Sequence, residues 1–293
     1  MIRYAVVEAP SVLGLFPGGV EDLPAALLGA GLLEAISARH AGRVTSPLHE
    51  ASRDPESGVR NVRQLRAYSI QLAEAVGLVL DEGDVPVVLG GDCSILLGPA
   101  LELRRRGRYG LFFLDGHADF YQPSAEPAGE AASMDLALVT GRGPLALTDI
   151  DGLRPLFRDG DVVQFGRRDA EEAANAGSQR IEDTNILTLP LQEVRDMGVA
   201  EASAAALRRL TRSDLDGFWV HLDCDVLSDE IMPAVDYRLP GGLTWEELET
   251  VLGLATDAGR SVGFEVTIFN PRLDPDGSQA RRLVSALARG LQR

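Results

Sequence analysis

The chain has 293 residues, of which 45% are hydrophobic and 25% charged, as in a globular protein long enough to bury a large core. Its formal net charge of -16 argues against nucleic-acid binding, because phosphate contacts need a basic surface, and it favours cationic small molecules. The sequence contains no lysine, which excludes a Schiff base or a Walker-type phosphate loop built on that amine.

The strands and helices can be predicted from the alternation of short apolar runs with amphipathic stretches. In chain order we expect strand Tyr4–Val7, helix Leu23–Ala38, helix Val62–Leu80, strand Val85–Leu89, strand Gly110–Leu114, strand Val162–Phe165, strand Ile186–Leu189, helix Leu191–Leu210, strand Phe218–Leu222, helix Thr244–Asp257, strand Val262–Val266 and helix Ser278–Gln292. This alternation predicts one α/β domain over residues 1–293, with a mainly parallel sheet flanked by helices on both faces. The segment Tyr121–Ala131, rich in Pro, Gly, Ala and Glu, is predicted to be an exposed loop.

The ends of the chain and its cysteines bear on where the protein works. No basic segment followed by an apolar core opens the sequence, and no window approaches about eighteen uninterrupted apolar residues. We therefore expect a cytoplasmic protein without membrane contact. Cys93 and Cys224 both stand in motif-like stretches, and a disulfide between them is not expected.

Two apolar runs end in clusters of ligating side chains. Asp115, His117 and Asp119 follow LFFL, while Asp223 and Asp225 follow FWVHL. Residues two apart on an extended chain face the same side, and the carboxyl ends of parallel strands share one edge of a sheet. One such cluster is equally compatible with a polar strand end, but two favour divalent cations that offset the buried charge. Carboxylates with an imidazole suit Mn²⁺ and can bridge two ions.

Two further apolar runs carry unusual residues. VPVVLGGDCS places Cys93 after a Gly-Gly turn that allows close backbone approach. GFEVTIFNP places Glu265 in a buried run, where a carboxylate is costly unless it binds a metal or a cation, so it is a candidate anchor for a guanidinium or amidinium group. His221 lies two residues before Asp223 and is expected to be a proton relay beside the metals or a core histidine.

Taken together, these motifs resemble the arginase/agmatinase (ureohydrolase) family over nearly the whole chain. LGGDCS resembles its Gly-Gly-Asp-His-Ser motif, LDGHADF its Asp-Ala-His-x-Asp motif, HLDCDVL its Ser-x-Asp-x-Asp motif and PGGLTWEE its Gly-Gly-Leu-Thr segment. The resemblance implies an arginase-like three-layer fold and a homo-oligomer, a trimer or hexamer. It also implies a hydrolase that cleaves a C–N bond of a linear amidine or guanidino compound by attack of a metal-bound hydroxide.

The resemblance also assigns ligands for one or two Mn²⁺ ions. The first ion would be held by position 93 with Asp115, Asp119 and Asp223, and the second by Asp115, His117, Asp223 and Asp225. Glu265 matches the family glutamate that orients the substrate, and His221 is a candidate for proton transfer. GRRDAEE resembles the family segment near the substrate's amino end, which makes Asp169 and Glu171 candidate substrate contacts.

The sequence departs from the family at four places. Cys93 replaces the histidine of the first site, and its softer thiolate favours Zn²⁺ or Fe²⁺ over Mn²⁺, with Co²⁺ and Ni²⁺ as alternatives. The family's loop histidine is missing from positions 132–134. Tyr121 replaces the asparagine that reads an α-amino-acid carboxylate in arginases, which puts arginine itself in doubt as the substrate. Arg238, in an altered turn, is a candidate partner for an acidic substrate group.

Three alternative functions stay open. A cysteine at the histidine position, DGH-x-DF and an Asp-Tyr turn also resemble a hydroxyguanidine (hydroxyarginine-type) hydrolase. A metal-dependent deacylase on a related fold is a second alternative, against which Glu265 and the Gly-Gly-Leu-Thr segment argue. The third is a catalytically degenerate family member that acts as a binding protein. The loss of two family histidines favours it, and retention of His117 and the aspartates opposes it.

Overall fold

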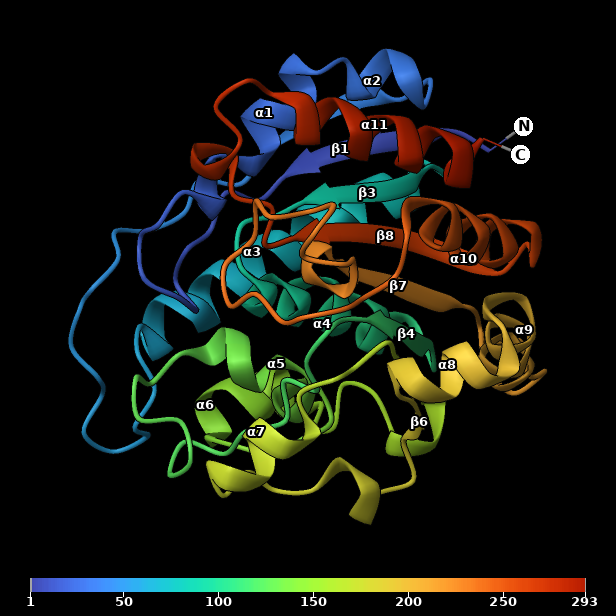
Figure 1. Cartoon of the computed structure of the whole chain (residues 1–293). Coiled ribbons are helices and arrows are strands. Elements are labelled where there is room, and N and C mark those ends of the chain that lie inside the picture. The colour runs from blue at the N-terminus through green and yellow to red at the C-terminus, as the bar shows by residue number, and fades with distance from the viewer. Residues whose placement is uncertain (1, 293) are drawn as a thin grey trace.

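A sheet of eight strands runs through the middle of the molecule (Figure 1). The computed structural model describes residues 2–292, so positions 1 and 293 of the expected domain lie outside the described residues. The strand order is β2-β1-β3-β8-β7-β4-β5-β6, and all neighbours pair in parallel. The strands are β1 Tyr4–Glu8, β2 Arg39–Arg43, β3 Val85–Leu89, β4 Gly110–Leu114, β5 Val162–Phe165, β6 Leu187–Leu189, β7 Phe218–Asp223 and β8 Ser261–Thr267.

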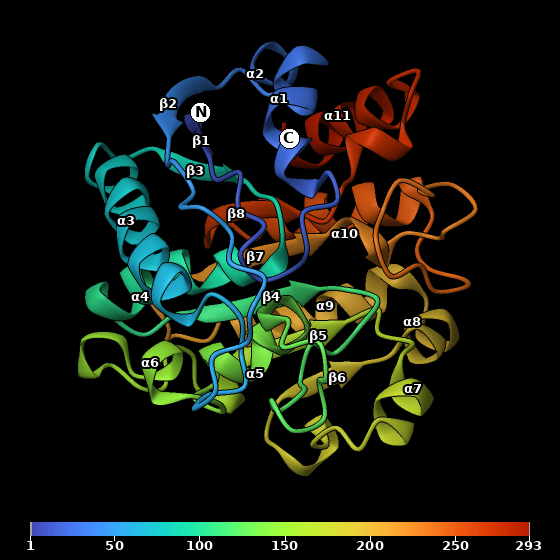
Figure 2. The same ribbon diagram turned by 90° about the vertical axis from the view of Figure 1, so that its left-hand side faces the viewer.

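Helices cover both faces of this sheet. They are α1 Leu23–Gly29, α2 Leu32–Ala35, α3 Val62–Asp81, α4 Leu97–Arg106, α5 Asp135–Val139, α6 Leu145–Thr148, α7 Ala170–Asn175, α8 Leu191–Met197, α9 Val199–Leu210, α10 Trp245–Asp257 and α11 Ser278–Leu291. Figure 2 shows α3, α4 and α6 on one side of the strands and α10 and α11 on the other. Among residues 2–292, no helix has both the length and the apolar character that crossing a bilayer requires.

A separate apolar core lies between the sheet and each helical layer. Leu252 of α10 and Leu283 of α11 belong to one core, while Leu72 of α3 and Leu101 of α4 belong to the other. All residues of β4 and β7 are buried, because central strands of a parallel sheet are covered on both faces. The predicted three-layer α/β domain with a mainly parallel sheet is confirmed.

The structure differs from the expected elements at the helices and at one edge of the sheet. The helix expected over Leu23–Ala38 is divided into α1 and α2 at Gly31, whose φ of 88° is left-handed. The helix expected over Leu191–Leu210 is divided into α8 and α9 at Gly198, with φ of 80°. Strand β2 was not predicted, because its residues RHAGR are exposed or half-buried at the sheet edge and form no apolar run.

Candidate metal centre and cavity

The ligating residues gather where four adjacent strands end, β3, β8, β7 and β4. Asp115 directly follows β4, and Asp223 is the last residue of β7. Cys93 begins a short 3₁₀ helix just after β3. The Gly-Gly turn before it requires glycine, because a Cβ on Gly91 would lie 1.7 Å from the carbonyl oxygen of Ser11. Parallel pairing thus brings residues far apart in sequence to one edge of the sheet.

Backbone N–H groups fix the carboxylates of the loops after β4 and β7, and one of these hydrogen bonds joins the two loops. Asp115 accepts from the His117 N–H at 2.6 Å, and Asp225 accepts from the Gly116 N–H at 2.9 Å. Asp223 accepts from the Asp225 N–H at 2.7 Å. Each bond uses one carboxylate oxygen and leaves the other for a further partner. The carboxylates are therefore fixed in place before any ligand binds.

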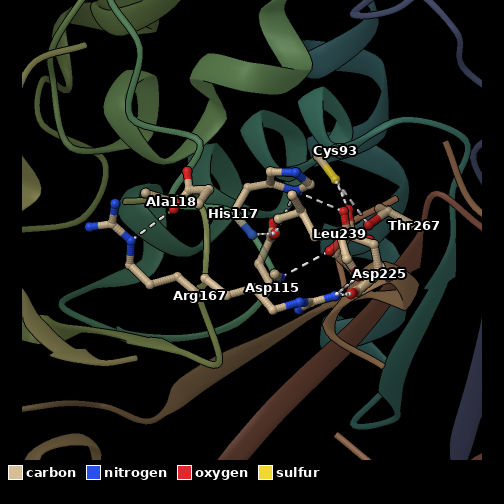
Figure 3. Close-up of polar contacts among 12 residues, drawn as sticks. Cys93, Asp115, His117, Ala118, Arg167, Asp225, Leu239 and Thr267 are labelled. Atoms are coloured by element: carbon tan, nitrogen blue, oxygen red, sulfur yellow. Dashed lines mark hydrogen bonds and ion pairs between the residues drawn. The ribbon is translucent and has the colours of Figure 1, made fainter. Parts of the chain in front are cut away.

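Three overlapping groups of donors result, and within each group the ligand atoms lie within 4.8 Å of one another. The groups are Cys93–Asp115–His221–Asp223, Cys93–Asp119–Asp135 and Asp115–His117–Asp225. Figure 3 shows Cys93, Asp115, His117 and Asp225 converging on this region. All six residues expected to bind metal thus come together. The structure adds His221 and Asp135 to the set of possible ligands.

The buried carboxyl groups of this cluster would be stabilised by a cation. Burial, followed by the charge of Asp225, raises the pKa of Asp115 to about 6. Burial and neighbouring carboxylates also raise the pKa values of Asp119, Asp135 and Asp223 well above their ordinary range. Both oxygens of Asp135 and one oxygen of Asp115 are buried without a hydrogen-bond partner. These observations fit a divalent ion, which would satisfy the orphaned oxygens and offset their charge.

The Cys93 thiol lies inside this cluster and is 1% exposed. Its Sγ donates to Asp223 Oδ2 at 2.8 Å and lies 3.2 Å from Thr267 Oγ1 (Figure 3). Burial and nearby carboxylates, Asp223 first among them, raise the pKa of the thiol well above its ordinary value. A cation in place of the shared proton would release the thiolate as a ligand.

A cavity of about 240 Å³ opens above the cluster. Its floor is formed by Cys93, His117, Asp119, Asp223 and Asp225. Its walls come from the segments after β1, β4, β7 and β8 and from the region of α7, through Leu15, Tyr121, Ala125, Glu126, Pro127, Glu130, Ala132, Ser133, Glu172, Ala176, Asp236, Tyr237 and Ile268. No arginine is among these described lining residues, whereas seven of them carry a carboxyl group, so the lining is predominantly acidic.

The segment Tyr121–Ala131 is not the exposed loop that its composition predicts. Glu126 and Glu130 are 8% and 2% exposed, and both line the cavity. Glu130 accepts a hydrogen bond from the Tyr237 hydroxyl at 2.7 Å, while its second carboxylate oxygen is buried without a partner. Sequence reasoning missed both glutamates, because acidic residues among Pro and Gly are typical of solvent-exposed loops. Tyr121, an expected substrate contact, does line the cavity.

Three other expected substrate contacts are placed elsewhere. Asp169 accepts from the Ala118 N–H at 3.0 Å and pairs with Arg167 at 2.9 Å, so it supports the loop after β4. Figure 3 shows Ala118 and Arg167 beside this loop. Glu171 is exposed and does not line the cavity. The helical turn of α7 instead directs the next residue, Glu172, to the cavity.

Arg238 also stays outside the cavity, since its guanidinium pairs with Asp229 at 3.2 Å and borders a neighbouring hollow. Asp169, Glu171 and Arg238, all predicted substrate contacts, thus lie outside the lining of the cavity in this structure.

The structure places Glu265, the expected substrate anchor, away from the lining of the cavity. Its side chain is 0% exposed and does not line the cavity. Glu265 Oε1 lies 2.6 Å from His221 Nδ1, on the neighbouring strand β7. His221 is equally buried and stacks on the Phe113 ring at 4.4 Å between centroids. Ile268, beyond the end of β8, is the residue that this segment presents to the cavity.

Comparison with known proteins indicates the same family as the motifs gathered at this edge of the sheet. The family model described as the arginase family matches residues 18–291. An arginase of Bacillus caldovelox is 30% identical over 299 residues, which cover 98% of this chain and 97% of that protein. An arginase of Staphylococcus aureus (strain MRSA252) is 26% identical over 288 residues, covering 96% and 94%.

The solved structure of the Bacillus caldovelox arginase matches with a TM-score of 0.89 at 26% identity, and the match covers 100% of this chain and 99% of that one. These matches confirm the predicted family resemblance, and with it the prediction of a hydrolase that acts on C–N bonds of linear amidines. The chain belongs to the arginase family.

Proposed function

We propose that this protein is a metal-dependent hydrolase that cleaves a C–N bond of a small cationic amidine or guanidino compound lacking an α-carboxylate. The observation that carries this proposal is the acidic cavity, whose floor is the donor cluster and whose lining contains no arginine. A cationic compound would be attracted to such a cavity, and an anionic group would be repelled.

The floor of the cavity supplies the chemistry. Divalent ions held there would lower the pKa of water and polarise the amidine carbon towards attack. The residues that hold them are rigid, because the carboxylates of Asp115, Asp223 and Asp225 are already fixed by backbone N–H donors. Asp119, on the cavity floor, remains available to accept hydrogen bonds from amidine N–H groups.

The carboxylates on the walls of the cavity favour a substrate with a second cationic group. Glu126, Glu130, Glu172 and Asp236 line the cavity in addition to the carboxylates of its floor. A substrate carboxylate there would meet like charges, and Arg238, which borders the adjoining hollow, is already paired with Asp229. An ammonium or second amidinium group would instead find the unpartnered oxygen of Glu130. We therefore favour a guanidino amine such as agmatine over arginine.

A matched pair of substrates tests this proposal. Agmatine and arginine share the guanidinium and differ by one carboxylate, so urea release from each by protein loaded with Mn²⁺, Zn²⁺, Co²⁺ or Ni²⁺ isolates the charge effect. We expect a higher kcat/KM for agmatine. Equal or faster turnover of arginine would contradict the charge argument. Absence of urea from every guanidino compound, with release of acetate from acetylated amines, would favour a deacylase.

The proposal extends to the cofactor and the assembly. The group Asp115–His117–Asp225 offers carboxylate oxygens and one imidazole, which suit Mn²⁺. We also propose a cytoplasmic homo-oligomer, a trimer or a hexamer, as the family resemblance implies. Size-exclusion chromatography with light scattering would measure the mass in solution, and a monomer of 31.4 kDa would contradict this part.

A further inference from the structure

We propose that His221 is a direct metal ligand in this chain. The site would combine Cys93 Sγ, Asp115 Oδ2, His221 Nε2 and an Asp223 oxygen, and Glu265 would orient the imidazole from behind. This inference rests on the proposed metal dependence but not on the proposed substrate. It changes the ligand set that the family resemblance implies, in which Asp119 rather than His221 completes the site around position 93.

The first argument is the unpaired nitrogen of a fully buried histidine. His221 and Glu265 are both 0% exposed, and His221 Nδ1 lies 2.6 Å from Glu265 Oε1. This contact takes the Nδ1 proton and leaves the Nε2 lone pair facing the centre. His221 Nε2 has no hydrogen-bond partner, although buried polar atoms are nearly always paired.

The second argument is the group that faces this nitrogen. Asp115 Oδ2 is also buried without a hydrogen-bond partner and lies 4.0 Å from His221 Nε2. That separation is too long for a hydrogen bond between the two atoms. Two orphaned acceptors on opposite sides of a gap of this width leave space for one cation that both can ligate.

The third argument is the geometry of the four donors. Metal–ligand bonds of 2.0–2.3 Å place tetrahedral donors about 3.3–3.8 Å apart. The spacing of His221 Nε2 and Asp115 Oδ2, 4.0 Å, lies just above this range. The spacing of Cys93 Sγ and Asp223 Oδ2, 2.8 Å, lies below it because a proton now joins the two atoms. Replacing that proton by an ion requires only a small outward shift.

Glu265 has a defined role in this arrangement. A carboxylate bound to the second nitrogen of a ligating histidine fixes the tautomer and makes the imidazole a stronger donor. The Phe113 ring, stacked at 6° to the imidazole, holds the plane of the ring. Glu265 thus becomes a positioning residue for the metal, which explains why a carboxylate is retained where it cannot reach the cavity.

The donor set also predicts which ion binds. One thiolate, one imidazole and two carboxylates form the mixed tetrahedral set that suits Zn²⁺ and its spectroscopic substitute Co²⁺. The neighbouring group Asp115–His117–Asp225 lacks sulfur and suits Mn²⁺. Asp115 belongs to both groups and would bridge the two ions. The chain would then hold two different metals in one centre.

Cobalt titration of the metal-free full-length protein tests the inference. Tetrahedral Co²⁺ with a thiolate ligand absorbs strongly in the visible and shows a sulfur-to-cobalt charge-transfer band, whereas Co²⁺ bound to oxygens in an octahedron absorbs weakly. We expect one tight Co²⁺ with both features. Cys93→Ser should lose the charge-transfer band. Glu265→Gln should keep the spectrum but raise the Co²⁺ Kd about 10- to 100-fold.

Two variants, Asp119→Asn and Glu265→Gln, distinguish a site completed by His221 from one completed by Asp119. Asp119→Asn is the matched control and should leave the spectrum and Kd of the first Co²⁺ unchanged. His221→Asn removes the imidazole that pairs with the fully buried Glu265 and is expected to destabilise the fold. Glu265→Gln therefore decides the matter, because the amide still accepts from His221 Nδ1.

Asp119→Asn could remove the tetrahedral bands while Glu265→Gln titrates like the unaltered protein. The ion would then be bound by Cys93 together with Asp119 and not His221, and the inference would be wrong. Absence of any thiolate-bound Co²⁺ would also overturn it. A failure of the proposed function alone would look different. The cobalt spectra would then be as expected, but no guanidino compound would release urea.

Discussion

Replacing Glu130 by glutamine removes one charge from the cavity wall and little else. Glu130 is 2% exposed, one of its oxygens accepts from Tyr237, and the other has no partner. The glutamine keeps the size of the side chain and can still accept the Tyr237 hydrogen bond. A hydrogen bond between a substrate cation and a buried carboxylate contributes about 1.5–3 kcal/mol. The substitution should therefore lower kcat/KM for a guanidino amine roughly 10- to 150-fold.

The assay compares two substrates in the Mn²⁺-loaded protein. Agmatine carries a terminal ammonium group, whereas a butylguanidine of the same length lacks it. Glu130→Gln should impair agmatine turnover by the factor above and leave butylguanidine turnover nearly unchanged. Glu201→Gln, on the exposed surface of α9, serves as the matched control. Equal losses for both substrates would show that Glu130 is only structural, and no loss for either would place the substrate's cation elsewhere.

Three further predictions concern the metal centre. Asp225→Asn should lose bound Mn²⁺ and urea release together, as measured by elemental analysis and assay, and full activity in this variant would refute its role as a ligand. Cys93→His should raise the Mn²⁺ content after dialysis towards two ions per chain, whereas two tightly held Mn²⁺ ions in the unaltered protein would contradict the account of Cys93. The metal-free protein should lose stability as pH rises. Its buried carboxyls have folded pKa values above the unfolded value of about 4, with Asp115 at about 6 and Asp119 and Asp223 also raised. Above about pH 4 the folded state binds more protons than the unfolded state. The stabilisation from these protons is lost as the pH rises through the folded-state pKa values. The Tm of chelator-treated protein should be higher at pH 5.5 than at pH 7.5. Loading with Mn²⁺ should remove or reverse this slope, and identical slopes with and without metal would contradict the argument.

The position of the metal centre could be predicted from the sequence because the expected ligands lie at or just beyond the ends of apolar runs. Asp115 and Asp223 come at the ends of β4 and β7, and a parallel sheet brings such ends together. The strands themselves were predictable for the same reason. Helix breaks at Gly31 and Gly198 were not, since a glycine in an amphipathic stretch is compatible with a continuous helix until packing selects a positive φ.

The position of Glu265 away from the cavity has a specific physical cause. The sequence places this residue on a strand but not at a depth along it. In the structure, β8 continues to Thr267, which pairs with Asp223, so Glu265 lies one layer below at the level of His221. Register between strands depends on the whole sheet and cannot be read from one run.

Glu130 was missed for a different reason. It becomes part of the site only because the segment Tyr121–Ala131 folds inward, and that folding depends on contacts with residues far away in the sequence, such as Tyr237.

The metal centre is the foundation of the account, and anomalous X-ray diffraction from crystals grown with Zn²⁺ and Mn²⁺ tests it most directly. Data collected at the absorption edges of both metals locate each ion by its identity. We predict a zinc peak among Cys93, His221 and Asp223, and a manganese peak beside His117 and Asp225, about 3.5–4 Å away. Crystals without an anomalous peak at the carboxyl ends of β4 and β7 would contradict the account.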